Sequence, residues 1–400
     1  MVLWLGKNLK KALVSLVLAA TVVWAVHWAV LDRAVENQDY GGRERRGALE
    51  HFAGAQYDFG MQAWYENRLE EAQSLFGEAV SVNPLYINAW LRLAEVRQVE
   101  GEVEKAKEIL LFTDLLAGDV VKWKWRQLLM ARQLGMEEMF VENINFVIPF
   151  YQLRDQALEL VDTHYGGQTE RVLERLETKN LSDYLGWLMQ RGRVKDSLAA
   201  WKFLNEKREV DRELYERYIR FLVRNKEIPA AVRIREAYTG LKDEMANPGF
   251  EEPMSGNVFG WQAWSRDFWD IRRDRYEKHE GDYSLKVEFS GKENINFHHV
   301  RQYAPVEPGN TYKLVFWWKS SRLTTDKLPF VEVRGVDCKN AHWKTEMIAP
   351  DSDWHEQSLT FEPGDDCNAV MIRLRRHKSH RFDSDIDGAV WIDKFRLKSE

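Results

Sequence analysis

The feature that most constrains the fold of this chain is a change in the spacing of its apolar residues at residues 247–252. Before this segment apolar residues recur at helical spacing, and after it they alternate as they do in strands. The segment reads Asn-Pro-Gly-Phe-Glu-Glu. A Pro-Gly pair cannot continue a helix, because proline lacks the backbone N–H and restricts the residue before it. The last helix is therefore predicted to end by Ala246, and a domain built of strands begins at residue 247.

The chain is long enough for several domains with hydrophobic cores of their own. It has 400 residues, of which 44% are hydrophobic and 12% aromatic, and this composition argues against disorder. Its net charge of -6 is small for this length, which argues against a protein held on nucleic acid by bulk charge.

An uncharged and mostly apolar run, residues 12–31, lies near the N-terminus. As a helix rising about 1.5 Å per residue, it is long enough to cross a bilayer. Lys7, Lys10 and Lys11 precede the run, whereas charges of both signs follow it, so the positive-inside rule keeps the N-terminus in the cytoplasm. The sequence predicts a single-pass protein of a bacterial inner membrane, with its bulk in the periplasm; a cleaved signal peptide is the alternative. The predicted segments are a cytoplasmic tail at 1–11, a transmembrane anchor at 12–31 and a polar stalk at 32–52.

Small and large residues follow the stalk at positions typical of a 34-residue repeat. Positions 8, 20, 24, 27 and 32 of the first unit hold Gly60, Ala72, Phe76, Ala79 and Pro84. Small residues at positions 8 and 20 let two helices approach, and a large residue at position 24 fills the space around their crossing. The pattern resembles the tetratricopeptide repeat, which implies a superhelix of five to six helical hairpins over residues 53–246. The register slips after Gly135, so a shortened hairpin is expected around Gly166 and Gly167.

Tetratricopeptide arrays mostly bind segments of other proteins, so this resemblance implies a protein partner in the concave groove. Residues outside the repeat consensus on the first helix of a hairpin are the best candidates for contacting it. They are Asn88, Arg92 and Arg97.

Five stretches after residue 246 occur in the order found in carbohydrate-binding modules of the family 4/9 type. They are residues 247–261, 281–287, 306–312, 353–361 and 390–393. The resemblance implies a β-sandwich with jelly-roll topology over residues 247–400. Such modules often hold a structural calcium ion between the opening loop and the last strand, which implicates Glu251 and Asp393 here.

Alternation along three predicted strands assigns side chains to the two faces of a sheet. If these strands share one sheet, one exposed surface is lined by Trp317, Glu332, Arg334, Arg373 and Arg375. An indole stacks on a sugar ring, while carboxylate and guanidinium groups bond its hydroxyl groups, and the arginines favour an acidic polysaccharide. An ordinary solvated face, whose charges pair across strands, is the alternative. Four other tryptophans lie in loops or short strands, and some of them must be core: Trp261, Trp264, Trp269 and Trp343.

The most basic stretch of the chain is residues 373–381. It is predicted to form a loop tip, either merely solvated or in contact with phosphate, uronate or anionic lipid groups.

Both cysteines, Cys338 and Cys367, lie in the predicted β domain. A disulfide between them is expected if that domain sits in an oxidising compartment, and two buried thiols are the alternative.

No phosphate-binding loop, dinucleotide fingerprint, zinc-protease helix or paired-cysteine motif occurs in the sequence, so no catalytic residue and no cofactor besides the structural calcium are assigned.

The predicted fold is multidomain, with a transmembrane helix, a tetratricopeptide α-superhelix and a C-terminal β-sandwich jelly roll. The predicted function is a periplasmic scaffold that binds proteins through its repeats and a glycan through its jelly roll, as an accessory of exopolysaccharide assembly or export. A pure protein–protein scaffold and an enzyme with an unrecognised active site are the alternatives.

Overall fold

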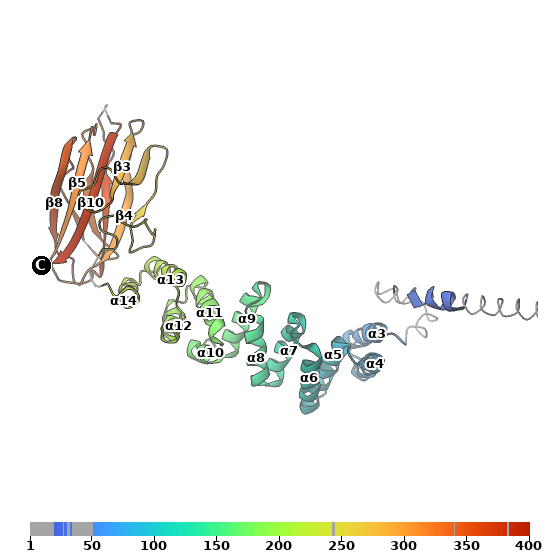
Figure 1. The fold of residues 1–400 in the computed structure, drawn as a ribbon. Coiled ribbons are helices and arrows are strands. Elements are labelled where there is room, and N and C mark those ends of the chain that lie inside the picture. Colours follow the sequence, from blue (N-terminus) through green and yellow to red (C-terminus); the bar gives the residue numbers. More distant parts are fainter. Residues whose placement is uncertain are drawn as a thin grey trace, which may run out of the picture. The chain divides into compact units, whose positions relative to one another are not determined.

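The computed structural model describes residues 20–26, 28–29, 33, 51–241, 245–339, 341–381 and 384–400. It shows a helical region followed by a two-sheet antiparallel β-sandwich (Figure 1). The chain forms two compact units, residues 1–187 and 188–400, so the last helices belong to the same unit as the sandwich.

Among the residues that the structure describes, no helix is long and apolar enough to cross a membrane. More than half of the predicted anchor at residues 12–31 lies outside these residues, as do the whole predicted tail at 1–11 and most of the stalk at 32–52. The membrane anchor therefore stays a prediction.

Consecutive helices in the first unit pack against one another in pairs, such as α3 with α4, α5 with α6 and α7 with α8. The helices are α3 (Ala53–Tyr65), α4 (Leu69–Val82), α5 (Ile87–Val99), α6 (Val103–Ala117), α7 (Val121–Leu134), α8 (Glu137–Val147), α9 (Tyr151–His164), α10 (Thr169–Arg175) and α11 (Thr178–Gln190), the last of which spans the division between the units. Gly135 ends α7 with a left-handed φ of 67°, a conformation that glycine adopts without strain.

The first helix pair shows the small-against-large packing that the repeat pattern predicts. The ring of Phe76 on α4 lies directly against Gly60 on α3, where an added Cβ would be 2.6 Å from the ring. The short α10, of 7 residues, follows Gly166 and Gly167, where a shortened hairpin is expected. Membership of the tetratricopeptide family stays a prediction.

Three helices of the second unit precede the sandwich: α12 (Val194–Lys207), α13 (Arg212–Arg224) and α14 (Ile228–Thr239). Asp211 caps α13, because its side chain accepts the backbone N–H of Leu214 at 2.7 Å. Gly240 ends α14 with a φ of 72°, and Met245 already packs in the core of the sandwich. The helices thus end before residue 246, as the Pro-Gly pair predicts.

The sandwich consists of two five-stranded sheets. Sheet A has the strand order β1-β4-β9-β6-β7, and sheet B has the order β2-β3-β10-β5-β8. The strands are β1 (Gln262–Ala263), β2 (Trp269–Asp274), β3 (Ser284–Ser290), β4 (Phe297–Pro305), β5 (Tyr312–Ser321), β6 (Phe330–Gly335), β7 (His342–Lys344), β8 (Ser352–Phe361), β9 (Ala369–Arg376) and β10 (Asp387–Ser399).

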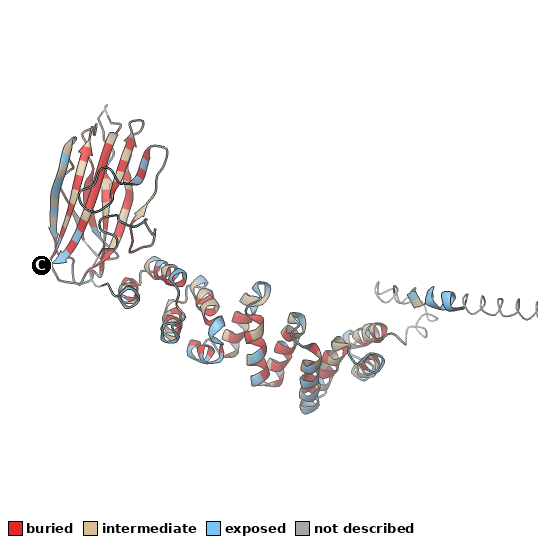
Figure 2. Ribbon diagram, in the orientation of Figure 1, coloured by how far each residue is buried: buried red, intermediate tan, exposed pale blue. Residues whose placement is uncertain are grey.

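The core of the sandwich lies between the two sheets, and burial alternates along strands such as β5 and β9 (Figure 2). In β5 the residues Tyr312, Leu314, Phe316 and Trp318 are buried, as the alternation predicts. Val331 of β6 and Ile372 of β9 meet this core from sheet A. Each sheet therefore presents its other face away from the core.

Candidate functional site

Basic side chains gather on the outer face of sheet A. Register brings Arg301 of β4 opposite Arg373 of β9, which in turn lies opposite Glu332 of β6, and Glu332 lies opposite Lys344 of β7. Residues that are directly opposite in antiparallel strands project to the same side of the sheet. We call this surface the basic face, made up of Trp264, Arg301, Glu332, Arg334, His342, Lys344, Arg373 and Arg375.

Glu332 is the acidic residue at the centre of the basic face. Its carboxylate accepts a hydrogen bond from Arg373 Nε and lies 2.6 Å from His342 Nε2, and the residue is only 3% exposed. Burial by itself raises the pKa of Glu332, but the bonds from Arg373 and His342 outweigh it, and the pKa is lowered. Glu332 is therefore charged at neutral pH, and its charge is already neutralised within the face.

Trp264 and Arg301 form the aromatic end of the basic face. The Arg301 guanidinium lies over the Trp264 ring, 5.4 Å from its centroid, and Arg301 Nε donates to Gln262 Oε1 at 2.9 Å. Trp264 is half-buried, with its ring edge-on to His299. Sequence reasoning missed both residues in this role, although Arg301 alternates with the buried Val300 and Gln302 and so carried a signal for an outward side chain.

Arg375 lies on the basic face and bonds the segment that leads into β4. Its guanidinium donates to the backbone oxygens of Phe297 and Arg376, each at 2.9 Å, and to the Asn296 side chain. Burial, with the nearby charge of Arg373, lowers the pKa of Arg375. One terminal nitrogen of Arg375 is thus used inside the domain, whereas its buried Nε has no hydrogen-bond partner among the described residues.

Trp317 does not lie on the basic face, so the prediction of one surface for all five candidate residues is wrong. Trp317 belongs to β5 in sheet B, whereas Glu332, Arg334, Arg373 and Arg375 belong to sheet A. Its ring stacks on His279 with centroids 3.7 Å apart, so one side of the indole is covered. The reason is that alternation tells which face of a strand is buried but not which sheet the strand joins, and the chain crosses between the sheets after β5.

A comparison with family models agrees with this architecture. Residues 243–377 match the model CBM_4_9, a carbohydrate binding domain. The C-terminal sandwich is therefore a carbohydrate-binding domain of this type, and the match ends before β10. No curated protein matches the chain.

Several solved structures are similar to the carbohydrate-binding domain. One, described as "CBM4 structure and function", is 16% identical, with 39% of this chain and 99% of that chain covered and a TM-score of 0.28. "Family 16 Carbohydrate Binding Module-2" is 16% identical, with 38% and 98% covered and a TM-score of 0.29. The CBM22-1 xylan-binding domain from Paenibacillus barcinonensis Xyn10C is 15% identical, with 39% and 94% covered and a TM-score of 0.27.

Glu251 and Asp393, the predicted calcium ligands, lie together in the carbohydrate-binding domain. A Cβ added to Gly249 would be 3.5 Å from Glu251 Oε1 and 3.6 Å from Asp393 Oδ1. The Asp393 carboxylate is fully buried and accepts backbone N–H groups at 2.9, 3.2 and 2.7 Å from His279, Glu280 and Lys394. Burial raises the pKa of Asp393 to about 7, and the charge of Glu251 acts in the same direction.

Two neighbouring carboxylates fit a hard cation such as Ca²⁺ in donor type. No third acidic, histidine or cysteine side chain joins them among the residues that the structure describes. Backbone carbonyl oxygens and water would have to supply the remaining ligands.

The carboxylate pair predicts a pH-dependent effect of Ca²⁺ on stability. Because the pKa of Asp393 is raised above its unfolded value, its proton stabilises the folded domain below about pH 4, and this contribution is lost as pH rises through about 7. A bound Ca²⁺ would replace the proton, so we expect Ca²⁺ to raise the melting temperature more at about pH 8 than at about pH 5. Calorimetry of the whole chain with and without chelator measures this. An absent effect of Ca²⁺ at both pH values would show that the pair binds no metal, and an equal effect at both would show that bound Ca²⁺ does not replace the Asp393 proton.

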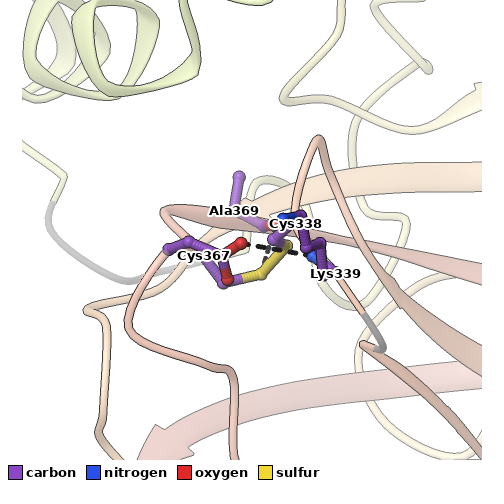
Figure 3. Close-up of a disulfide and its surroundings, with 5 residues drawn as sticks. Cys338, Lys339, Cys367 and Ala369 are labelled. Carbon is purple, nitrogen blue, oxygen red and sulfur yellow. Dashed lines mark hydrogen bonds between the residues drawn. A yellow bond between two sulfur atoms is a disulfide. The ribbon is translucent and has the colours of Figure 1, made fainter.

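Cys338 and Cys367 form a disulfide in the carbohydrate-binding domain (Figure 3). Their Cα atoms are 5.2 Å apart, within the usual range for this bond. Cys338 follows β6 and Cys367 precedes β9, so the bond joins two loops at the same end of neighbouring strands.

The predicted partner-binding residues do not all lie together. Asn88 on α5 accepts a hydrogen bond at 2.7 Å from Arg126 on α7, and Arg126 and Arg92 both lie near Glu95. Arg97 instead pairs at 2.6 Å with Glu102 at the start of α6, and the role of the three residues in partner binding stays a prediction. Residues four apart share a helix face, as Asn88 and Arg92 do, but Arg97 is five residues further on and turns away.

Proposed function

We propose that this protein binds an acidic glycan through the basic face of its carbohydrate-binding domain. The excess of cationic donors over carboxylates on that face carries the proposal. Glu332 is engaged by Arg373 and His342. The terminal guanidinium nitrogens of Arg301 have no hydrogen-bond or ion-pair partner among the described residues. The same holds for every guanidinium nitrogen of Arg334. An ordinary solvated face, by contrast, would have its charges paired across the strands.

The side chains of the basic face suit the two kinds of surface on a sugar. The indole of Trp264 is half-buried and lies beneath the Arg301 guanidinium, so a pyranose ring would stack on the part of its apolar surface that stays exposed. The guanidinium groups of Arg301 and Arg334 donate paired hydrogen bonds that match carboxylate geometry. Together they favour a chain of sugars in which some residues carry a carboxylate.

Trp264→Ala is expected to weaken binding of the whole protein to an acidic polysaccharide by about tenfold, because one stacking platform is worth about 1.4 kcal/mol or more. Arg301→Met is expected to weaken binding similarly and to make the remainder less sensitive to salt. Calorimetric titration with alginate, polygalacturonate and hyaluronan measures both effects.

Matched variants on sheet B provide the controls. Trp317→Ala and Arg396→Met remove the same groups from β5 and β10 and are expected to leave affinity unchanged. A loss of binding in Trp317→Ala with the fold intact would instead move the site to sheet B. If the wild-type protein binds no polysaccharide, a scaffold that binds proteins alone replaces this proposal.

In the same proposal, the helical region binds protein partners. The protein lies at the outer side of a bacterial inner membrane, where it assists exopolysaccharide assembly or export and catalyses no reaction itself. The disulfide supports an oxidising compartment. The apolar run at residues 12–31 supports an anchor. A reporter fused after Glu400 that is active only outside the cytoplasm would agree with this placement, and activity inside would exclude it.

A further inference from the structure

A cavity of about 290 Å³ lies at one end of the basic face. Three segments line it: the start of β6 with the residues before it, the end of β7 with the residues after it, and His377 directly after β9. Its lining residues are Lys327, Leu328, Phe330, Lys344, Thr345, Glu346, Met347 and His377. Its size suits one sugar residue rather than a chain.

The cavity is continuous with the basic face through shared strands. Lys344 belongs to both, and Phe330 lies opposite Arg375 in the register of β6 and β9. His377 Nδ1 is 3.0 Å from a terminal nitrogen of Arg375. A glycan that lies across the basic face can therefore place a terminal or branching residue in the cavity.

The lining of the cavity combines an apolar surface with unpaired positive charge. Leu328, Phe330 and Met347 supply the apolar part, and Met347 is 51% exposed although it is a large apolar side chain. Lys327 and Lys344 form no ion pair with any residue that the structure describes, while Glu346 is the acidic residue of the lining. An apolar surface beside two ammonium groups suits a ring that carries an anionic group.

Backbone hydrogen bonds hold the cavity walls in place. The carbonyl of Lys327 accepts from Arg376 Nε at 3.0 Å, and the N–H of Ile348 donates to the carbonyl of Pro329 at 2.7 Å. The N–H of Val331 donates to Thr345 Oγ1 at 3.1 Å. The segments that carry the two lysines are thus positioned before any ligand binds, which lowers the entropic cost of binding.

We propose that this cavity binds one uronate residue of the glycan, with its carboxylate within reach of the Lys327 and Lys344 ammonium groups and its ring against Leu328, Phe330 and Met347. This proposal rests on the glycan-binding function proposed above and adds the substrate class. The cavity selects glycans by a carboxylate, whereas Trp264 and Arg301 contact the sugar chain at the other end of the face.

The test compares uronate polysaccharides with their carboxyl-reduced forms, in which each uronate has become the neutral hexose. Alginate, polygalacturonate and hyaluronan are titrated into the wild-type protein and into the double variant Lys327→Met, Lys344→Met. The double variant is expected to bind at least one of these uronate polymers about tenfold or more weakly than wild type does, because two charge-assisted bonds are lost. Its affinity for the carboxyl-reduced polymer is expected to equal that of wild type.

Lys313→Met combined with Lys398→Met is the matched control. These lysines are exposed neighbours on β5 and β10 of sheet B, so the control removes the same net charge far from the cavity. It is expected to bind uronate polymers as wild type does. An equal loss in the control would reduce the effect to net charge and overturn the proposal.

The remaining outcomes separate this proposal from the function on which it rests. If wild type binds native and carboxyl-reduced polymers equally, and Trp264→Ala weakens both, glycan binding by the basic face stands, while its preference for acidic glycans and the uronate cavity both fall. If carrageenan, which is sulfated and lacks uronate, binds as tightly as alginate with the same dependence on the two lysines, the assignment to a carboxylate is overturned. If no polysaccharide binds at all, both proposals fail.

Discussion

Arg376→Met is expected to lower the free energy of unfolding of the carbohydrate-binding domain by about 4 kcal/mol, one of the two largest effects expected here. Arg376 ends β9 and is fully buried, yet no carboxylate among the residues that the structure describes forms an ion pair with it. Its guanidinium instead donates to five neutral oxygens, those of Lys327, Ile295, Ser384, Asn294 and Thr325. Methionine fills the space of the side chain's stem but removes all five of these hydrogen bonds, although Asn294 Oδ1 keeps the one that it accepts from the Ser379 N–H.

Urea unfolding of the whole chain, followed by near-ultraviolet circular dichroism, measures this effect. Arg381→Met is the matched control, because the Arg381 side chain is 77% exposed and meets Asp326 only at 3.4 Å, so its loss is expected to cost under about 0.5 kcal/mol. Arg376→Lys keeps the charge, but its single ammonium group cannot reach all five oxygens. Its free energy of unfolding is therefore expected to lie between those of wild type and Arg376→Met. An Arg376→Met protein as stable as wild type would show that the three loops around the guanidinium hold together without it.

The structural role of Arg376 also corrects the interpretation of residues 373–381 as a basic loop tip. Period-two alternation places Arg376 on the same side of β9 as the buried Ile372 and Leu374. Charged residues rarely lie in a core unless they are paired. The many basic residues of 373–381 therefore suggested an exposed loop, whereas the alternation along β9 indicated that Arg376 points into the interior. The strand pattern was the better guide.

The order and class of the domains could be predicted from local chemistry. The Pro248-Gly249 pair must end a helix, and the change from helical to alternating apolar spacing follows from which side chains each element buries. The same local reasoning identified the buried side of β5, including Phe316 and Trp318. These features depend on residues that are neighbours in the sequence.

The candidate site was harder to predict because it depends on strand order. Trp317 and Arg373 each alternate with buried residues of their strand and so face outward, yet they belong to opposite sheets. Trp264 lies on the basic face only because the short β1 pairs with β4, and a strand of two residues leaves too few positions for alternation to show. The cavity with Lys327 and Lys344 likewise forms only where three separate segments meet.

Gly60→Leu is expected to destabilise the helical unit by about 3 kcal/mol, the second of the two largest effects. Gly60 lies within α3, and a Cβ there would be 2.6 Å from Phe76 Cε1, whose side chain is fully buried in α4. Leucine favours helix over glycine by roughly 0.5–1 kcal/mol, so a net loss must come from the forced separation of the two helices. Urea unfolding followed by the helical circular dichroism signal measures it.

Gly77→Leu makes the same replacement within α4, where nothing lies within 4 Å of an added Cβ. It is expected to leave stability unchanged or raise it by up to about 1 kcal/mol through helix propensity alone. In the Gly60→Leu background, Phe76→Ala is expected to cost less than it does in wild type, because the smaller side chain makes room for the leucine. Equal behaviour of the two leucine variants would mean that α3 and α4 do not meet through Gly60. The packing reason given for the small residues of the 34-residue pattern would then be wrong, even though the residues recur at that spacing.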